Sequence, residues 1–263
     1  MEAKAKIAII GGTGLADSNL FKFIEHIEVK TPFGKPSGKI TITDFNGTMV
    51  AFLPRHGAGH VIPPHKVNYR ANIHALKELG VEHILAFTAV GSLRDDMKPG
   101  DIVIPDQFID MTKRRELTFY DGPKVVHISA ADPFCANLRK LAADVVKKLG
   151  IRHHGNGTYI CVDGPRFSTR AESKLWKIMK ADVVGMTLVP EAQLAREAEI
   201  CYLSVSSVTD YDVWADKPVN ASDIIETMKK NSENVVYIVR EIIPLIKGKR
   251  VCECATALKN AEL

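Results

Sequence analysis

The stretch HKVNYRANIHALKELGVEHILAFTAV, residues 65–90, decides the fold class of this chain. Its first part spaces its apolar residues as an amphipathic helix does, at Val67, Ile73, Leu76 and Leu79. A glycine then closes the helical pattern, as a helix C-cap commonly does. The second part is a run rich in apolar and β-branched residues, which is typical of a buried strand. A helix followed at once by a buried strand predicts an α/β sheet with covering helices.

The same alternation extends along the rest of the chain. Strands are expected at residues 6–10, 39–45, 48–54, 81–90, 100–110, 157–164, 181–186 and 200–208, with a hairpin turn at Asn46-Gly47. Helices are expected at residues 65–80, 132–150, 169–180, 189–198 and 222–247. Asp132 is the expected N-cap of the second helix, and Pro244 should bend the last one. No repeat or linker interrupts the pattern, so we expect one domain over residues 1–263, ending in a long helix and a short tail.

The composition excludes several kinds of partner. The 263 residues, 46% hydrophobic and 25% charged, are typical of a globular protein. The net charge of +4 is spread without a basic block, so no nucleic acid partner is expected. No apolar run reaches the ~20 residues that span a bilayer, and the start MEAKAKIAII shows no small-residue cleavage site. We therefore expect a cytoplasmic protein without a membrane partner.

Five cysteines are too few and too scattered for a secreted disulfide framework. Cys252 and Cys254 form a C-x-C pair in the tail. A metal site needs further ligands, and none is adjacent in the sequence, so no metal is expected. A disulfide between the two cysteines and a pair of ordinary free thiols both remain open.

Polar or small residues follow six of the expected strands at their carboxyl ends. They are the GGTG turn with Thr13, then Arg55 and His56, Thr88 and Ala89, Asp163 to Phe167, Met186 and Thr187, and Asp210 and Asp212. In open α/β sheets, ligands bind outside the carboxyl ends of the strands. These segments therefore predict one shared crevice.

One part of this crevice is suited to a free phosphate dianion. Arg55 offers a planar fork of donors, and His56 would donate a second hydrogen bond. The hydroxyls of Thr13, Thr88 and Thr187 would complete the set. The GGTG turn is neither a P-loop nor a full dinucleotide fingerprint, and no acidic cluster indicates Mg²⁺.

The motifs, taken in order, resemble the 5'-methylthioadenosine phosphorylase family, part of the trimeric purine nucleoside phosphorylase superfamily. The resemblance rests on GGTG, the run from Arg55 to Asp110, DGPRFSTRAES, VVGMTLVPEAQLAREA and TDYDVW. It implies a mixed twisted central sheet flanked by helices, and phosphorolysis of a purine nucleoside with phosphate as co-substrate and no cofactor. It also implies a homotrimer or a hexamer built as a dimer of trimers.

The resemblance also implies roles for single residues. Phosphate would bind at Thr13, Arg55, His56, Thr88, Ala89 and Thr187, while ribose and purine would meet Phe167, Met186, Asp210, Tyr211 and Asp212, with Ser168 and Ile224 tuning specificity. His127 and Phe134 would reach a neighbouring subunit. The C-terminal CEC resembles the C-x-C of some heat-stable archaeal members, where it can form a disulfide.

The two acids of TDYD fit the chemistry of a departing purine. The leaving base gains negative charge, and a protonated Asp210 would relieve it at N7, since burial raises the pKa of a carboxyl. A carboxylate also accepts a hydrogen bond from a 6-amino group, which favours adenine. A 6-oxopurine nucleoside phosphorylase, a dinucleotide-dependent oxidoreductase and a non-catalytic purine-binding module are the alternatives.

Overall fold

The computed structural model describes residues 4–11, 19–215 and 221–262. Two long parallel strands form its centre: β5 (His83–Ser92) and β11 (Cys201–Asp210). They pair from Cys201 opposite His83 up to Asp210 opposite Gly91. Nearly every residue of β11 is buried, as its unbroken apolar and small-residue sequence requires for a strand covered on both faces.

The remaining strands extend this centre into a mixed sheet of eleven strands among the described residues. On one side lie β1 (Ile7–Ile10), β4 (Thr48–Leu53), β3 (Ile40–Phe45) and β2 (Lys22–Ile27). On the other lie β10 (Val183–Gly185), β9 (Thr158–Cys161), β7 (Gln107–Asp110), β6 (Ile102–Val103) and β8 (His153–His154). Because β1, β4 and β11 all run parallel to β5 or to its neighbour, their carboxyl ends meet at one edge.

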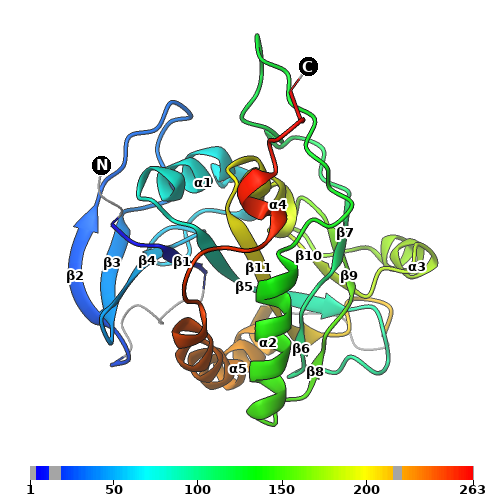
Figure 1. The fold of residues 1–263 in the computed structure, drawn as a ribbon. Coiled ribbons are helices and arrows are strands. Elements are labelled where there is room, and N and C mark those ends of the chain that lie inside the picture. Colours follow the sequence, from blue (N-terminus) through cyan, green and yellow to red (C-terminus); the bar gives the residue numbers. More distant parts are fainter. Residues whose placement is uncertain (1–3, 12–18, 216–220, 263) are drawn as a thin grey trace.

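Helices cover both faces of the sheet (Figure 1). One face carries α1 (Tyr69–Glu78) and α4 (Leu188–Glu197), and the other carries α2 (Ala136–Lys148) and α5 (Ala221–Ile242). Successive strand residues alternate between the two cores: Ile84 packs toward α1, whereas Leu85 packs toward α2 and α5. A fifth helix, α3 (Arg170–Ile178), covers a smaller cluster around Trp176. The predicted α/β fold with helices on a mixed sheet is confirmed.

Several local predictions are also confirmed. Asn46 and Gly47 connect β3 to β4 with positive φ angles of 50° and 85°, as a two-residue hairpin turn requires. The helix predicted over residues 169–180 is present as α3, and Thr169 caps it: its side chain accepts from the backbone of Glu172 while the Glu172 side chain bonds back. The last long helix ends at Ile242, and Pro244 lies in the 3₁₀ turn Ile243–Leu245 that follows.

Other boundaries differ from the prediction. Residues 100–110 form two short strands, β6 and β7, because the chain leaves β11 at Pro105 and joins β9 on a different part of the sheet. α2 begins at Ala136 and not after Asp132, since Cys135 is held in extended backbone by a bond from its N–H to Tyr202 O at 3.1 Å. Strand β2 was not predicted, because the apolar residues of KFIEHI neither alternate with polar residues nor form an unbroken run.

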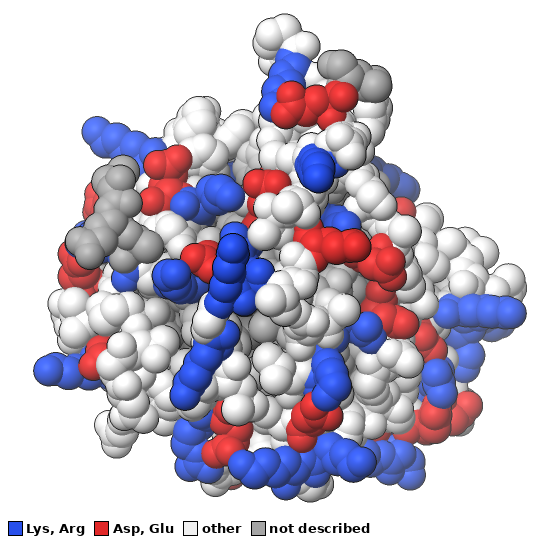
Figure 2. Space-filling view, in the orientation of Figure 1, with Lys and Arg blue, Asp and Glu red and all other residues white. Residues whose placement is uncertain are grey.

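Charges of both signs lie at the surface. Figure 2 shows positive and negative side chains interspersed over the face of Figure 1. Among the described residues, no helix combines the length and the apolar character needed to cross a membrane.

Candidate active site

The ends of β5 and β11 bring the predicted phosphate and purine residues together. Thr88 lies opposite Ser206 in the register, and its Oγ1 donates to Ser206 Oγ at 3.1 Å. Ala89 is one residue further along, and Gly91 lies opposite Asp210. Thr88 and Ala89 are half-buried at this edge. The two predicted halves of the site are therefore separated by only a few residues along paired strands.

Arg55 is held at this edge by a buried ion pair that the sequence did not reveal. Its Nε and Nη2 each donate to a Glu191 oxygen at 2.7 Å, and Nη1 donates to Phe87 O at 3.0 Å. Burial opposes the positive charge, but the Glu191 carboxylate outweighs it and holds the pKa of Arg55 above its ordinary value. Three of the five guanidinium N–H groups bond to described residues in this way, so two remain for an anion. Tyr202 fixes Glu191 in turn, its hydroxyl donating to Oε1 at 2.8 Å.

Gly11 makes room for this arginine. A Cβ at Gly11 would lie 2.6 Å from Phe87 O and 2.8 Å from Arg55 Nη1, and the residue has a φ of +80°. The first glycine of the predicted turn is therefore required both by its backbone conformation and by the approach of Arg55. Thr13, in the same turn, lies outside the described residues.

His56 is neutral in this environment. Burial, and then the charge of Arg55, lower the pKa of His56 to about 4. Its Nδ1 lies 2.8 Å from Ile62 O, which can only accept, so Nδ1 carries the hydrogen. In the neutral ring, Nε2 is then an acceptor and not the donor that the sequence analysis expected. Nε2 of the neutral ring can therefore accept an O–H, and it becomes a donor only when the ring is protonated.

Thr187 completes the described part of the predicted phosphate set. It is 8% exposed and precedes α4, and its side chain makes no capping bond to the helix. Tyr159 lies beside Thr187. Burial raises the pKa of Tyr159, and the Thr187 side chain and backbone, which are close to the Tyr159 hydroxyl, oppose this effect.

Asp210 is placed at the last position of β11. Its Oδ2 accepts from Thr209 Oγ1 at 2.7 Å, and its Oδ1 accepts from the Asp212 N–H at 2.8 Å. Burial raises the pKa of Asp210 above 3.8 despite these bonds. A Cβ at Gly91 would lie 2.9 Å from Asp210 Oδ1, so this glycine lets the acid pack against β5.

Asp212 is turned inward by an unusual backbone conformation. Its φ is 48°, and the residue is 4% exposed. Burial raises its pKa, opposed by the nearby hydroxyls of Ser173 and Ser168, so Ser168 lies close to this acid. Within the described part of the chain, Oδ2 of Asp212 is buried without a hydrogen-bond partner. A buried acceptor without a partner is costly, so this oxygen is suited to accept from a bound donor.

Met186 and Phe167 belong to loops that a buried arginine joins. Arg115 Nη2 donates to Met186 O at 2.8 Å and to Asp163 O at 3.0 Å, and the side chain is 2% exposed. A Cβ at Gly164 would collide with Met186 Sδ, so the loop that carries Phe167 packs directly on Met186. Phe167 itself is 39% exposed, as an aromatic that stacks on a ligand can be.

The other predicted residues occupy different surroundings. Tyr211 is half-buried, with its ring 5.6 Å from that of Trp214. Ile224 is half-buried on α5. His127 is exposed in the long segment between β7 and α2. Phe134, which was expected to reach a neighbouring subunit, is 5% exposed and packs in the core of its own chain, with its ring 6.3 Å from that of Tyr202. Its burial leaves no side-chain surface for such a contact.

A cavity with a volume of about 340 Å³ lies beside these loops. Its lining includes His65, Tyr69, Arg70 and Arg115. Tyr69 and Arg115 also bond to each other at 3.2 Å and to the Met186 carbonyl. The cavity is therefore adjacent to the ribose side of the predicted site, separated from it by this tyrosine and arginine.

Comparison with known proteins identifies relatives along nearly the whole chain. The family model described as the phosphorylase superfamily matches residues 6–244. The S-methyl-5'-thioadenosine phosphorylase of Thermofilum pendens is 57% identical, with 98% of each chain covered. The protein of the same name from Nitrosopumilus maritimus is 52% identical, with 100% of each covered.

Solved structures agree with these relatives. A methylthioadenosine phosphorylase from an antarctic soil metagenomic library has a TM-score of 0.95 and 43% identity, covering 100% of this chain and 93% of the other. The Schistosoma mansoni methylthioadenosine phosphorylase in complex with adenine has a TM-score of 0.91 and 40% identity, covering 97% and 96%. The chain described here thus belongs to the phosphorylase superfamily and, within it, to the S-methyl-5'-thioadenosine phosphorylases.

Proposed function

We propose that this protein cleaves S-methyl-5'-thioadenosine with inorganic phosphate, giving adenine and 5-methylthioribose 1-phosphate. A phosphate oxygen forms the new bond to C1', and the C1'–N9 bond breaks with its electron pair going to the purine. The purine takes up a proton at N7, and the proton lost by hydrogen phosphate balances the reaction. The enzyme is a pentosyltransferase, and its relatives at 52–57% identity carry this activity in their names.

The observation that carries the choice of purine is the buried Oδ2 of Asp212, which has no hydrogen-bond partner among the described residues. A 6-amino group donates to such an oxygen, whereas a 6-oxo group would place a second acceptor against it. Asp210 lies two residues away with a raised pKa, which suits a group that holds a proton for N7. Burial raises the pKa of both acids, and with one proton between them the pair supplies one acceptor and one acid, the set that adenine requires.

The phosphate residues support the reaction electrostatically. Arg55, fixed by Glu191, is positioned before phosphate arrives and needs no reorganisation at the moment of reaction. The bound anion lies next to the sugar, where it stabilises the positive charge that develops as the glycosidic bond breaks. It also serves as a nucleophile of fixed orientation. We propose that phosphate is a co-substrate and that no metal or organic cofactor takes part in this chemistry.

Following the phosphorus atom tests the proposed reaction. Incubation of the protein with S-methyl-5'-thioadenosine and phosphate should convert the phosphate signal in ³¹P NMR into that of a sugar 1-phosphate, in step with adenine release. Adenine release without a sugar phosphate would indicate hydrolysis and contradict the proposal. Asp210→Asn serves as the control that keeps the phosphate residues intact.

We also propose a homotrimer, alone or paired into a hexamer, that works in the cytoplasm. Exposed apolar residues on and just after α3 support the oligomer: Leu175, Ile178 and Met179 are 45%, 77% and 37% exposed. The exposed segment that carries His127 also supports it, since the resemblance predicts a contact of this histidine with a second subunit. Sedimentation equilibrium should give three or six chains, and cell fractionation should find the protein in the cytoplasm.

A further inference from the structure

Arg115 has a buried side chain that no step of the proposed reaction uses directly. The side chain is 2% exposed, although its neighbours Arg114 and Glu116 lie at the surface. It comes from the long segment between β7 and α2. A buried guanidinium needs an acceptor for each of its five N–H groups, so its partners show what the side chain holds in place.

One group of these partners lies at the carboxyl ends of two neighbouring parallel strands, β9 and β10. Nη2 of Arg115 donates to Met186 O at 2.8 Å, to Asp163 O at 3.0 Å and to Val162 O at 3.2 Å. Val162 and Asp163 follow β9, whereas Met186 follows β10. A single guanidinium therefore joins the two chain segments that leave the sheet at the edge where ligands bind in open α/β sheets.

The other side of the guanidinium reaches the first turn of α4. Nη1 of Arg115 donates to Val189 O and, at 3.2 Å, to Tyr69 Oη. The Tyr69 hydroxyl gives its own hydrogen to a carbonyl oxygen at 3.0 Å, so it is an acceptor for the arginine. Met186 and Val189 flank Thr187, and one side chain thus holds the backbone on both sides of this residue of the predicted phosphate set.

Asp163 balances the charge of the arginine. Nε of Arg115 donates to Asp163 Oδ1 at 3.3 Å, and the Lys113 N–H donates to Oδ2 of the same carboxylate at 3.1 Å. With this bond, every N–H group of the guanidinium has an acceptor among the described residues. Arg115 has no donor left for a substrate, so it acts only through the residues that it holds.

The segment that carries Arg115 is itself fastened to α4. Glu197, the last residue of α4, accepts from Thr118 Oγ1 and from the Phe119 N–H, both at 2.8 Å. Arg115 bonds near the start of the same helix, so both ends of α4 are tied to this segment. A side chain supported in this way is in place before any substrate binds.

We propose that Arg115 is a positioning residue for both substrates. It sets Met186 for the sugar, the loop of Phe167 for the purine and Thr187 for phosphate, an assignment that rests on the proposed function. These groups contact the substrates before the glycosidic bond breaks as well as during the reaction. Misplacing them therefore weakens binding of both substrates more than it slows the chemical step.

Arg115→Lys tests this assignment, because lysine keeps the charge beside Asp163 but replaces the planar fork with a single nitrogen. The Michaelis constant of each substrate is measured with the other at saturation, and circular dichroism follows folding. Both constants should rise by about tenfold or more, while kcat falls by less than about threefold. A purely structural role would reduce the folded fraction, which lowers kcat and leaves both Michaelis constants unchanged. That result would overturn the proposal.

Asp163→Asn is a milder second variant. It removes the carboxylate charge and leaves the bonds from Arg115 to backbone oxygens in place, so the protein should fold even where Arg115→Lys does not. The Michaelis constant of the nucleoside should rise by about threefold, because the arginine is held less firmly. Unchanged Michaelis constants in Asp163→Asn would count against the assignment as strongly as unchanged constants in Arg115→Lys.

Arg139→Lys is the matched control. Arg139 also donates to oxygens of other segments, those of Pro105 at 2.9 Å, Gly155 at 2.9 Å and Asn156 at 2.8 Å, but it lies on α2, on the opposite face of the sheet from α4. Its Michaelis constants should equal those of the unaltered protein. A rise equal to that of Arg115→Lys would refute a specific role for Arg115.

The unaltered protein separates this proposal from the function on which it rests. If the unaltered protein releases no adenine from S-methyl-5'-thioadenosine and phosphate, the proposed function is wrong. If it releases adenine and the variants of Arg115 and Arg139 have the same Michaelis constants, the function stands and the assignment of Arg115 is wrong.

Discussion

Removal of the Glu191 carboxylate tests whether a buried ion pair holds Arg55 for phosphate. The two side chains are 3% and 0% exposed and share two bonds of 2.7 Å. Removing one partner of a buried pair leaves an uncompensated charge and costs about 3–5 kcal/mol. At roughly 2–4 °C per kcal/mol for a chain of this size, Glu191→Ala should lower the melting temperature by roughly 6–20 °C. Added phosphate should restore part of this loss, because it neutralises the unpaired arginine charge.

An exposed pair of the same length is the control. Lys140 and Asp144 also lie 2.7 Å apart, but their side chains are 79% and 60% exposed. Asp144→Asn should change stability by less than about 1 kcal/mol, since water screens such pairs. Melting is followed by circular dichroism with and without phosphate, and the Michaelis constant for phosphate is measured beside it. Equal shifts in the two variants, or no phosphate rescue of Glu191→Ala, would refute the reasoning about Arg55.

Three further substitutions probe the two ends of the site. Asp210→Asn should lower kcat by about 10²-fold or more. Burial raises the Asp210 pKa above 3.8, so the stabilising contribution of this acid is full below that pH and is lost as pH rises through the folded pKa. The melting temperature of Asp210→Asn relative to the unaltered protein should therefore rise between pH 4 and 8, and a flat difference would contradict this. Gly91→Ala, whose Cβ would meet Asp210 Oδ1 at 2.9 Å, should lower kcat/KM for the nucleoside by about 10²-fold without altering the circular dichroism spectrum. Gly11→Ala should raise the Michaelis constant for phosphate by displacing Arg55. Gly47 has a similar φ of +85° and a Cβ there would meet nothing within 4 Å, so Gly47→Ala should leave this constant unchanged. Equal effects of the two variants would show that the contact between Gly11 and Arg55 is not the cause.

Much of the fold could be predicted because local patterns agree with it. The Asn46-Gly47 turn and the helix over residues 169–180 rest on signals within a few residues, and both are present. The start of α2 could not be predicted, because a distant strand, through Tyr202, holds Cys135 in extended backbone. The division of residues 100–110 into two strands likewise depends on two different partner strands.

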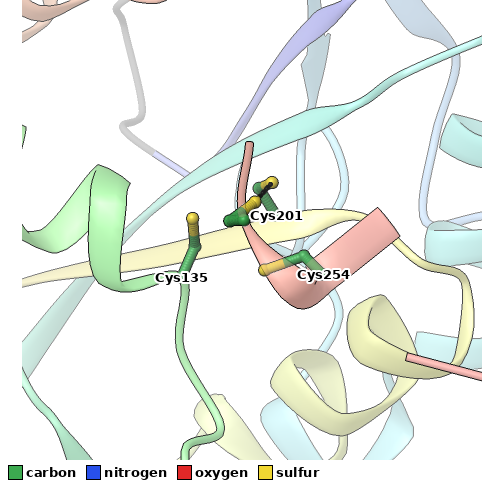
Figure 3. Close-up of side chains that lie close together, drawn as sticks. Cys135, Cys201 and Cys254 are labelled. Carbon is green, nitrogen blue, oxygen red and sulfur yellow. Dashed lines mark hydrogen bonds between the residues drawn. The ribbon is translucent and has the colours of Figure 1, made fainter. Parts of the chain in front are cut away.

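The site could be predicted in part for the same reason. Asp210, Thr88 and Arg55 follow strands, and parallel strands bring their ends together. Glu191 gave no signal, because an acid in the first turn of a helix is ordinary in sequence and its partner lies 136 residues away. The sequence did not predict that Cys135, Cys201, Cys252 and Cys254 lie together (Figure 3), because they come from three separate segments.

A comparison of three nucleosides tests whether this protein is a phosphorylase of S-methyl-5'-thioadenosine. Base release from S-methyl-5'-thioadenosine, adenosine and inosine is followed with and without phosphate at equal concentrations. The account predicts phosphate-dependent release that is fastest from S-methyl-5'-thioadenosine and much slower from inosine, because Oδ2 of Asp212 accepts from a 6-amino group. Faster release from inosine, or release that does not need phosphate, would contradict it.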